Sequence, residues 1–113
     1  MKKVVTLAIA LFLIVFLVST PSVRAEEEIQ LEGAKIFQVQ CAGCHPGGGN
    51  IIRRGKNLKQ RAMRRNGMDS IAAVAEIVTN GKNNMSAFSD RLTPSEIEAV
   101  SAYVLDQAAT GWR

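Results

Sequence analysis

The chain has 113 residues, of which 47% are hydrophobic, and its formal net charge is +4. This length suits one domain and excludes a second one of ordinary size. Lys2, Lys3 and Arg24 lie in the first 25 residues, and without their three charges the net charge is only +1. A charge this small does not indicate a nucleic-acid-binding protein.

The first 25 residues have the pattern of an export signal. Residues 1–3 are basic, residues 4–18 are almost wholly apolar, residues 19–22 are polar and interrupt a helix, and Val23-Arg24-Ala25 resembles a peptidase site. An apolar run of about 15 residues is shorter than the roughly 20 that span a membrane, so an uncleaved anchor is the weaker alternative. We expect cleavage of residues 1–25 and a mature domain over residues 26–113.

The first helix of the mature domain is expected over residues 27–41. Small and apolar side chains recur there at three- and four-residue steps, namely Ile29, Gly33, Ala34, Phe37 and Cys41. The glycine-rich segment Pro46–Asn50 then ends the helix and opens a loop that extends to about residue 57.

Two short helices are expected next. Residues 58–65 form the first, which Asn66-Gly67 ends. Asp69 or Ser70 caps the second. Its apolar stripe consists of Ile71, Val74, Ala75 and Val78. Asn80-Gly81 ends this helix, and residues 82–90 form a second loop.

The last helix has the clearest start. Thr93-Pro94-Ser95-Glu96 combines an N-cap threonine, a proline at the first helical position and a glutamate three residues after the cap. Gly111 is expected to end this helix. No segment of the mature chain alternates as a strand does, so the predicted fold class is all-α, with about four helices and two glycine-rich loops.

The run Cys41-Ala42-Gly43-Cys44-His45 has the spacing of a haem c attachment motif. Two thiols three residues apart reach the two vinyl groups of one porphyrin, and the adjacent imidazole lies beneath the iron. The alternatives are a disulfide, a thioredoxin-like redox pair and a zinc site. Zinc needs four ligands where this chain offers three, and none of the alternatives needs the histidine. The motif favours one covalently bound haem c.

The second axial ligand cannot be a histidine, because His45 is the only one in the chain. The short helix places Met63 where core packing is its expected role, and Met68 directly precedes a helix cap. Met85 lies in the loop 40 residues after His45, far enough to reach the other face of the macrocycle. We expect His45 and Met85 as axial ligands, the alternative being a surface methionine without this role. Such a pair suits an electron carrier and disfavours a small haem peroxidase or a sensor.

Seven basic residues and no acid lie within residues 53–65, which we call the basic segment. They are Arg53, Arg54, Lys56, Lys59, Arg61, Arg64 and Arg65. The acids cluster instead within residues 26–32 and 96–106. The basic segment is either a solvated surface or a surface that docks a partner or faces the haem propionates. Export and the lack of interleaved aromatic residues disfavour nucleic acid as the partner.

Beyond these motifs, the chain resembles the cytochrome c6 family of class I c-type cytochromes, and within it the divergent c6-like members of cyanobacteria. The resemblance spans residues 30–112. It rests on Gly33, Phe37, Cys41 to His45, Gly47, Gly48, Asn50, Met85 to Phe88, Arg91-Leu92, Ala102 to Val104 and Gly111-Trp112. It implies the class I cytochrome c fold, in which about four helices wrap around one covalently attached haem. The first and last helices are then expected to meet near Gly33, Phe37 and Tyr103.

The resemblance also implies a function. Members are soluble, monomeric carriers of the thylakoid lumen or periplasm that form transient complexes. They move electrons from cytochrome b6f to photosystem I or to a terminal oxidase, and Arg91 matches an arginine that docks the photosystem.

Three departures stand out. Ser86 replaces a proline, Ser89-Asp90 replaces two glycines, and Ile77 replaces a glutamine that many members carry near the haem. Because an aliphatic side chain in the haem environment lacks the amide dipole, we hypothesise a lower midpoint potential and a role outside the main photosystem route.

Overall fold

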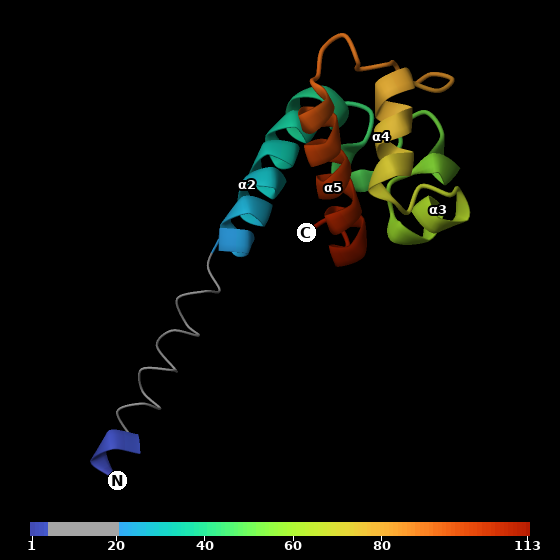
Figure 1. Cartoon of the computed structure of the whole chain (residues 1–113). Helices are drawn as coiled ribbons and strands as arrows, with labels where there is room; N and C mark the ends of the chain where they lie inside the picture. Colours follow the sequence, from blue (N-terminus) through green and yellow to red (C-terminus); the bar gives the residue numbers. More distant parts are fainter. Residues whose placement is uncertain (5–20) are drawn as a thin grey trace.

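The computed structural model describes residues 1–4 and 21–113; residues 5–20, the apolar part of the expected signal, lie outside the described residues. The described helices are α2 (Pro21–Ile36), α3 (Gln60–Arg65), α4 (Ile71–Asn80) and α5 (Pro94–Thr110) (Figure 1). A π-helical turn, Phe37–Cys41, continues α2, and two 3-10 turns lie at Pro46–Gly48 and Arg54–Lys56. The described residues contain no strand beyond one isolated bridge between Lys82 and Met85. The all-α prediction is confirmed.

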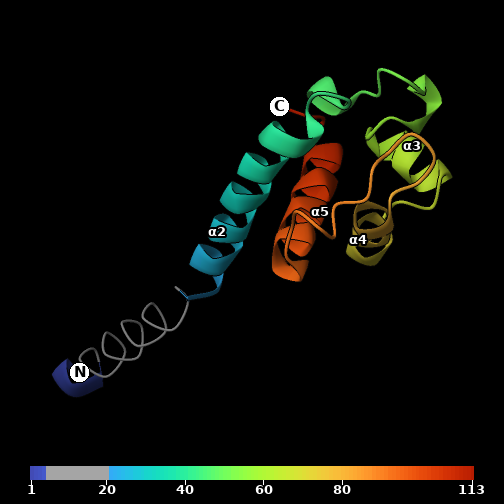
Figure 2. The ribbon, with the colours of Figure 1, turned by 90° about the horizontal axis from the view of Figure 1, so that it is seen from above.

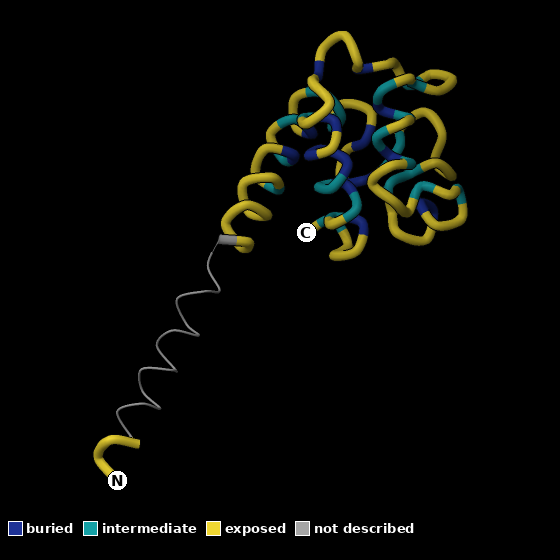
Figure 3. The backbone as a smooth tube through the Cα atoms, in the orientation of Figure 1, coloured by how far each residue is buried: buried dark blue, intermediate teal, exposed yellow. Residues whose placement is uncertain are grey.

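Helix α2 begins earlier than the sequence indicated. Residues 21–26, which lie before the expected position, are already helical in the described part of the chain. Residues 22–29 are all exposed, as Figure 3 shows along the lower part of α2. This N-terminal extension therefore contributes nothing to the core, and cleavage after Ala25 stays a prediction.

The first and last helices touch at a glycine, as expected. A Cβ atom on Gly33 would collide with the carbonyl oxygen of Ala99 and would lie 2.7 Å from the Cβ of Tyr103. One turn further along α2, the ring centroid of Phe37 lies 5.6 Å from that of Tyr103. Both views show α2 beside α5 (Figures 1 and 2). The predicted contact is confirmed, and only glycine permits so close an approach at residue 33.

The helix ends follow the sequence signals closely. Thr93 Oγ1 accepts a hydrogen bond from Glu96 N at 3.3 Å, and Glu96 Oε2 accepts one from Thr93 N at 2.7 Å, which completes a capping box. Ser70, rather than Asp69, caps α4, since its Oγ accepts from Ala73 N at 3.2 Å. Gly111 ends α5 in the left-handed conformation at φ 83°.

The core is formed by α5 together with residues of the π-helical turn, α3, α4 and the loop before α5, and the buried segments are dark blue in Figure 3. Its buried apolar residues are Phe37, Met63, Val74, Val78, Phe88, Leu92, Ile97, Val100, Val104 and Ala108. Ser101, which is fully buried beside them, donates from its hydroxyl to the Ile97 carbonyl oxygen at 2.6 Å, so the hydroxyl is satisfied within the core.

No helix within residues 1–4 and 21–113 is both long enough and apolar enough to cross a membrane.

Candidate functional site

The two cysteines and the histidine of the motif come from a single turn at the end of α2. The π-helical turn ends at Cys41, whose carbonyl oxygen accepts hydrogen bonds from Cys44 N at 3.1 Å and His45 N at 2.9 Å. The two cysteines form no disulfide; Cys41 is half-buried and Cys44 is exposed. The backbone alone therefore brings the three predicted attachment residues together.

The surroundings of Cys41 favour an uncharged sulfur. Burial, and after it the neighbouring Cys44, raise the pKa of the Cys41 thiol from 9.0 to about 11. A thiolate at this position is therefore disfavoured at neutral pH. A thioether carries no charge, so the product of haem attachment suits the buried position better than the thiolate does.

His45 is buried, with 9% of its surface exposed, and its ring is held by the backbone. Its Nδ1 lies 2.8 Å from the carbonyl oxygen of Gly49. Because a carbonyl oxygen can only accept, Nδ1 carries the hydrogen, and in the neutral ring the lone pair is then on Nε2. A neutral imidazole oriented in this way is ready to bind a metal through Nε2.

The loop after the motif is built around the same turn. Ile51 N donates to the Cys44 carbonyl oxygen at 3.1 Å, and Leu58 N donates to the Gly48 carbonyl oxygen at 2.8 Å. Asn50 Oδ1 accepts from Arg53 N at 2.7 Å and stabilises the loop from within. These bonds connect residues 44–58 into one unit.

Trp112 closes this unit from the other end of the chain. Its Nε1 donates to the Leu58 carbonyl oxygen at 2.9 Å, and its ring centroid lies 5.0 Å from that of Phe37. Gly48 has a φ of +75°, and a Cβ atom there would collide with the Trp112 indole. The C-terminal Gly111-Trp112 pair is therefore a structural support of the motif loop.

Met85 lies in a tight turn directly after α4. Met85 N donates to the Lys82 carbonyl oxygen and Lys82 N donates to that of Met85, both at 3.0 Å. Asn83, inside this turn, has a positive φ of 52°, which asparagine tolerates better than most residues. The Met85 side chain is half-buried and packs against the core.

Ile77 lies on the last turn of α4, close to the start of the methionine loop. Its carbonyl oxygen accepts from Gly81 N at 2.8 Å, and its side chain is half-buried against the core. A Cβ atom on Gly81 would lie 2.6 Å from the Met85 carbonyl oxygen. The structure thus brings Ile77 and Met85 to the same end of α4 through Gly81.

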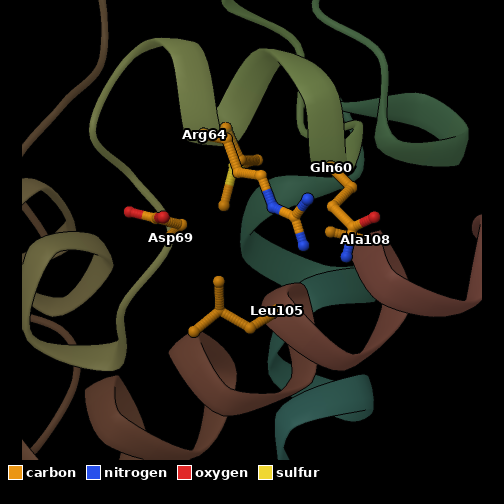
Figure 4. A pocket seen from close by; sticks show the side chains of 6 residues that line it. Gln60, Arg64, Asp69, Leu105 and Ala108 are labelled. Carbon is orange, nitrogen blue, oxygen red and sulfur yellow. The ribbon is translucent and has the colours of Figure 1, made fainter.

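The other two methionines serve packing. Met63 is 4% exposed within the core, and Met68 packs against it while its N donates to the Met63 carbonyl oxygen at 2.8 Å. Met63 also lines a cavity of about 210 Å³ between α3 and α5 (Figure 4). The remaining lining residues are Gln60, Arg64, Asp69, Leu105 and Ala108. None of the predicted haem residues lines this cavity.

The donor set fits a covalently bound haem better than a protein-only metal site. In the described part of the chain, no three histidine, cysteine or acidic side chains lie close enough to hold a metal ion. A haem needs only two thiols and an axial nitrogen on one side, which this turn offers, and a second donor on the other side. Cys41 and Cys44 would carry the porphyrin, with His45 and Met85 toward the iron.

Gly49 is the functional residue that sequence reasoning missed. Its contribution is a backbone carbonyl oxygen, which any residue type possesses, so no residue pattern indicates it. The glycine-rich run marked a loop, but the sequence carried no sign of which carbonyl faces the histidine.

The arginine side chains of the basic segment are exposed and unpaired within the described structure, whereas its two lysines form hydrogen bonds. Lys56 Nζ donates to Asn66 Oδ1 at 2.6 Å, and Lys59 Nζ donates to the Gly47 carbonyl oxygen at 2.9 Å. The five arginine side chains, by contrast, are exposed and make no ion pair or hydrogen bond within the described structure. They are Arg53, Arg54, Arg61, Arg64 and Arg65.

Comparison with known proteins gives concordant matches. Residues 29–104 match the family model described as cytochrome c oxidase, cbb3-type, subunit III. The chain is 54% identical over 113 residues to a cytochrome c6-like protein of Nostoc sp. (strain PCC 7120 / SAG 25.82 / UTEX 2576), with all of both chains covered.

Two solved structures have similar folds. Cytochrome c6C from Synechococcus sp. PCC 7002 has 60% sequence identity and a TM-score of 0.70, over 72% of this chain and 99% of that one. Cytochrome c6B from Synechococcus sp. WH8102 has 46% identity and a TM-score of 0.70, over 73% of this chain and 93% of that one.

Proposed function

The chain belongs to the cytochrome c6 family of c-type cytochromes, and we propose that Cys41, Cys44, His45 and Met85 hold the haem on which it carries its electron. As a member of this family it is an electron carrier with one covalently bound haem c, and it is not an enzyme. The haem supplies the one-electron redox change when bound. The chain orients it, surrounds it and sets its electrostatic environment.

The hydrogen bond from His45 Nδ1 to the Gly49 carbonyl oxygen is the observation that carries this proposal. It fixes the ring orientation and the tautomer, and it makes Nε2 a stronger ligand for iron. The ring is also largely buried, as expected for a metal ligand and not for a histidine that serves only as a surface residue.

Met85 is proposed as the second axial ligand because it is half-buried on the long loop after α4, whereas Met63 is enclosed in the core. Met68 is half-buried too, but it lies in the short connection between α3 and α4, where its N donates to the Met63 carbonyl oxygen. A thioether stabilises the reduced iron, and two protein ligands leave no open position for oxygen or peroxide. The arrangement suits outer-sphere transfer of one electron.

The ferric and ferrous spectra of the purified holoprotein test this proposal. We expect a weak ferric absorption at about 695 nm, typical of iron–methionine ligation, and no spectral change of the ferrous protein under carbon monoxide. Rapid binding of carbon monoxide would reveal an open position and favour a sensor instead.

We also propose that the carrier operates at a lower midpoint potential than other members of the family. Ile77 places an aliphatic side chain at the end of α4 from which the Met85 loop departs. No amide dipole from residue 77 then stabilises the reduced state. A lower potential would direct the carrier to a route outside the main supply of photosystem I.

The partners are proposed by family resemblance. Electrons would come from cytochrome b6f and pass to photosystem I or a terminal oxidase, through transient complexes of a soluble monomer in the thylakoid lumen or periplasm. This location requires removal of the signal, and the mass of the exported holoprotein would then correspond to residues 26–113. A mass that includes residues 1–25 would contradict it.

The basic segment is proposed to meet an acidic surface on such a partner. Its exposed arginines follow directly from the loop that holds His45, so a partner docked there would lie near the haem attachment turn. Long-range attraction of this kind raises the association rate and weakens with salt.

Reversing two of these charges tests the docking. Arg61→Glu with Arg65→Glu should slow electron transfer to purified photosystem I by about tenfold at low ionic strength, and the difference should disappear at high salt. Lys82→Glu, an exposed change outside the basic segment, is the control. If the double variant matched wild type with photosystem I and with terminal oxidase, the segment would be solvated surface only.

A further inference from the structure

We propose that Arg91 is a positioning residue that fastens the Met85 loop. The proposal deepens the function above and rests on ligation by Met85. It concerns the loop between α4 and α5, residues 81–92.

Phe88 anchors the middle of this loop in the core. Its side chain is 8% exposed, and its N donates to the Val78 carbonyl oxygen of α4 at 2.9 Å. The Phe88 carbonyl oxygen in turn accepts from Arg91 N at 3.0 Å and Leu92 N at 2.9 Å. The turn that carries Arg91 is therefore fixed relative to the core.

From this turn the Arg91 side chain folds back over Phe88 onto the Ala87 carbonyl oxygen. Its guanidinium carbon lies 4.4 Å from the centroid of the Phe88 ring, and Nη2 donates to the Ala87 carbonyl oxygen at 3.1 Å. A cation over an aromatic face that also donates to a carbonyl oxygen is held by two directional contacts. Ala87 is two residues from Met85, so the second contact holds the segment that carries the ligand.

Few other contacts hold this segment. Within the described structure, no side chain of residues 82–90 forms a hydrogen bond, and the bonds between Lys82 and Met85 lie inside the turn itself. The backbone of Met85 and Ala87 packs closely on Gly81, where a Cβ atom would lie 2.7 Å from Ala87 N. Among residues 1–4 and 21–113, Arg91 thus supplies the only side-chain hydrogen bond to the backbone of residues 82–90.

Asp90 reduces the value of Arg91 as a docking charge. Its Oδ1 lies 3.6 Å from Arg91 Nε, with the two side chains 79% and 46% exposed. So exposed an ion pair adds little stability, but it cancels the local net charge. We call the contact of Arg91 with the Phe88 ring and the Ala87 carbonyl oxygen the clamp. The clamp does not depend on Asp90.

The test is the rate at which added imidazole replaces the sixth ligand of the ferric holoprotein, because replacement requires the methionine loop to open. Arg91→Ala should react at least about tenfold faster than wild type and lose absorbance at about 695 nm. Arg91→Lys, which keeps the charge but not the planar group, should fall between them. Asp90→Asn should stay within about twofold of wild type. Arg61→Ala, which removes the same charge from an exposed arginine, should react as wild type does.

The outcomes separate the two levels of the proposal. If wild type lacks the absorption at about 695 nm, Met85 is not the ligand, and both proposals fall. If wild type shows it and Arg91→Ala reacts no faster than Arg61→Ala, only the clamp falls. An Asp90→Asn rate as high as that of Arg91→Ala would assign the effect to the ion pair and overturn the clamp. Should Arg91→Ala not accumulate as holoprotein, a wild-type rate in Arg91→Lys would overturn it.

Discussion

The two loops that carry the proposed axial ligands are held in place differently. The loop around His45 is tied by hydrogen bonds at several points along residues 44–58 and is closed by the Trp112 indole. The loop around Met85 is joined to the rest of the protein by the amides of Gly81 and Phe88, which donate to carbonyl oxygens of α4, and by the buried side chains of Phe88 and Leu92. The contact of Arg91 with Ala87 lies within the loop.

This difference has a consequence for function. The histidine loop follows α2 and is bonded to Trp112 at the end of α5, so its geometry is part of the fold. The methionine loop is held by fewer hydrogen bonds than the histidine loop, so its geometry can change at a smaller cost in stability. Substitutions around His45 should therefore change the free energy of unfolding, and substitutions around Met85 should change ligation and potential.

The largest expected effect on stability is at Gly48. Gly48→Ala places a Cβ into the Trp112 indole at a φ of +75° and should lower the free energy of unfolding by about 3 kcal/mol. Gly47→Ala is the matched control, because Gly47 has a φ of +56° with open space around it. It should lose only about 1 kcal/mol. Urea unfolding of the holoproteins measures both.

Equal losses at the two glycines would mean that backbone conformation alone matters and that the indole does not support the loop. The contrast between the two ligand loops would then lose its main basis.

A smaller effect, of another kind, is expected at Ile77. Ile77→Gln should raise the midpoint potential by about 60 mV, which is a tenfold change in a one-electron equilibrium, because an amide donor near the haem stabilises the reduced form. Stability should change by less than about 1 kcal/mol, since the side chain is only half-buried. Ile77→Leu, an aliphatic control, should leave the potential unchanged. Redox titration of the variants measures these potentials. An unchanged or lower potential in Ile77→Gln would contradict the hypothesis that the aliphatic side chain of Ile77 lowers the midpoint potential.

The smallest effect is expected at the C-terminus. Trp112→Phe keeps an aromatic ring against Phe37 but loses the bond to the Leu58 carbonyl oxygen, and should lower stability by about 1 kcal/mol. Tyr103→Phe is the control, because the Tyr103 hydroxyl makes no hydrogen bond within the described residues. Thermal unfolding compares the two, and an equal response would show that the indole N–H adds nothing to the histidine loop.

Features with their own residue signal could be predicted from the sequence. The capping box at Thr93 and Glu96 and the left-handed Gly111 require particular residue types, and both are confirmed. The contact at Gly33 followed from family resemblance and is confirmed too. The attachment motif is contiguous in sequence, so the proximity of its two cysteines and its histidine could also be predicted.

Features that depend on the backbone or on distant partners could not be predicted. The start of α2 was misplaced because apolar periodicity begins only where the helix meets α5, while the exposed turns before it carry no such pattern. The π-helical turn changes the helical period near Phe37, which a search for regular periodicity does not detect. The His45–Gly49 bond uses a carbonyl oxygen, and the fold of Arg91 over Phe88 depends on the loop conformation.

The most direct test of the account is the ferric absorption at about 695 nm in three methionine variants. The account predicts that Met85→Ala abolishes the band and opens the ferrous protein to carbon monoxide, while Met63→Ala and Met68→Ala retain the band in whatever holoprotein folds. A band that survives in Met85→Ala and is lost in one of the other two would contradict the central assignment of Met85 as the partner of His45.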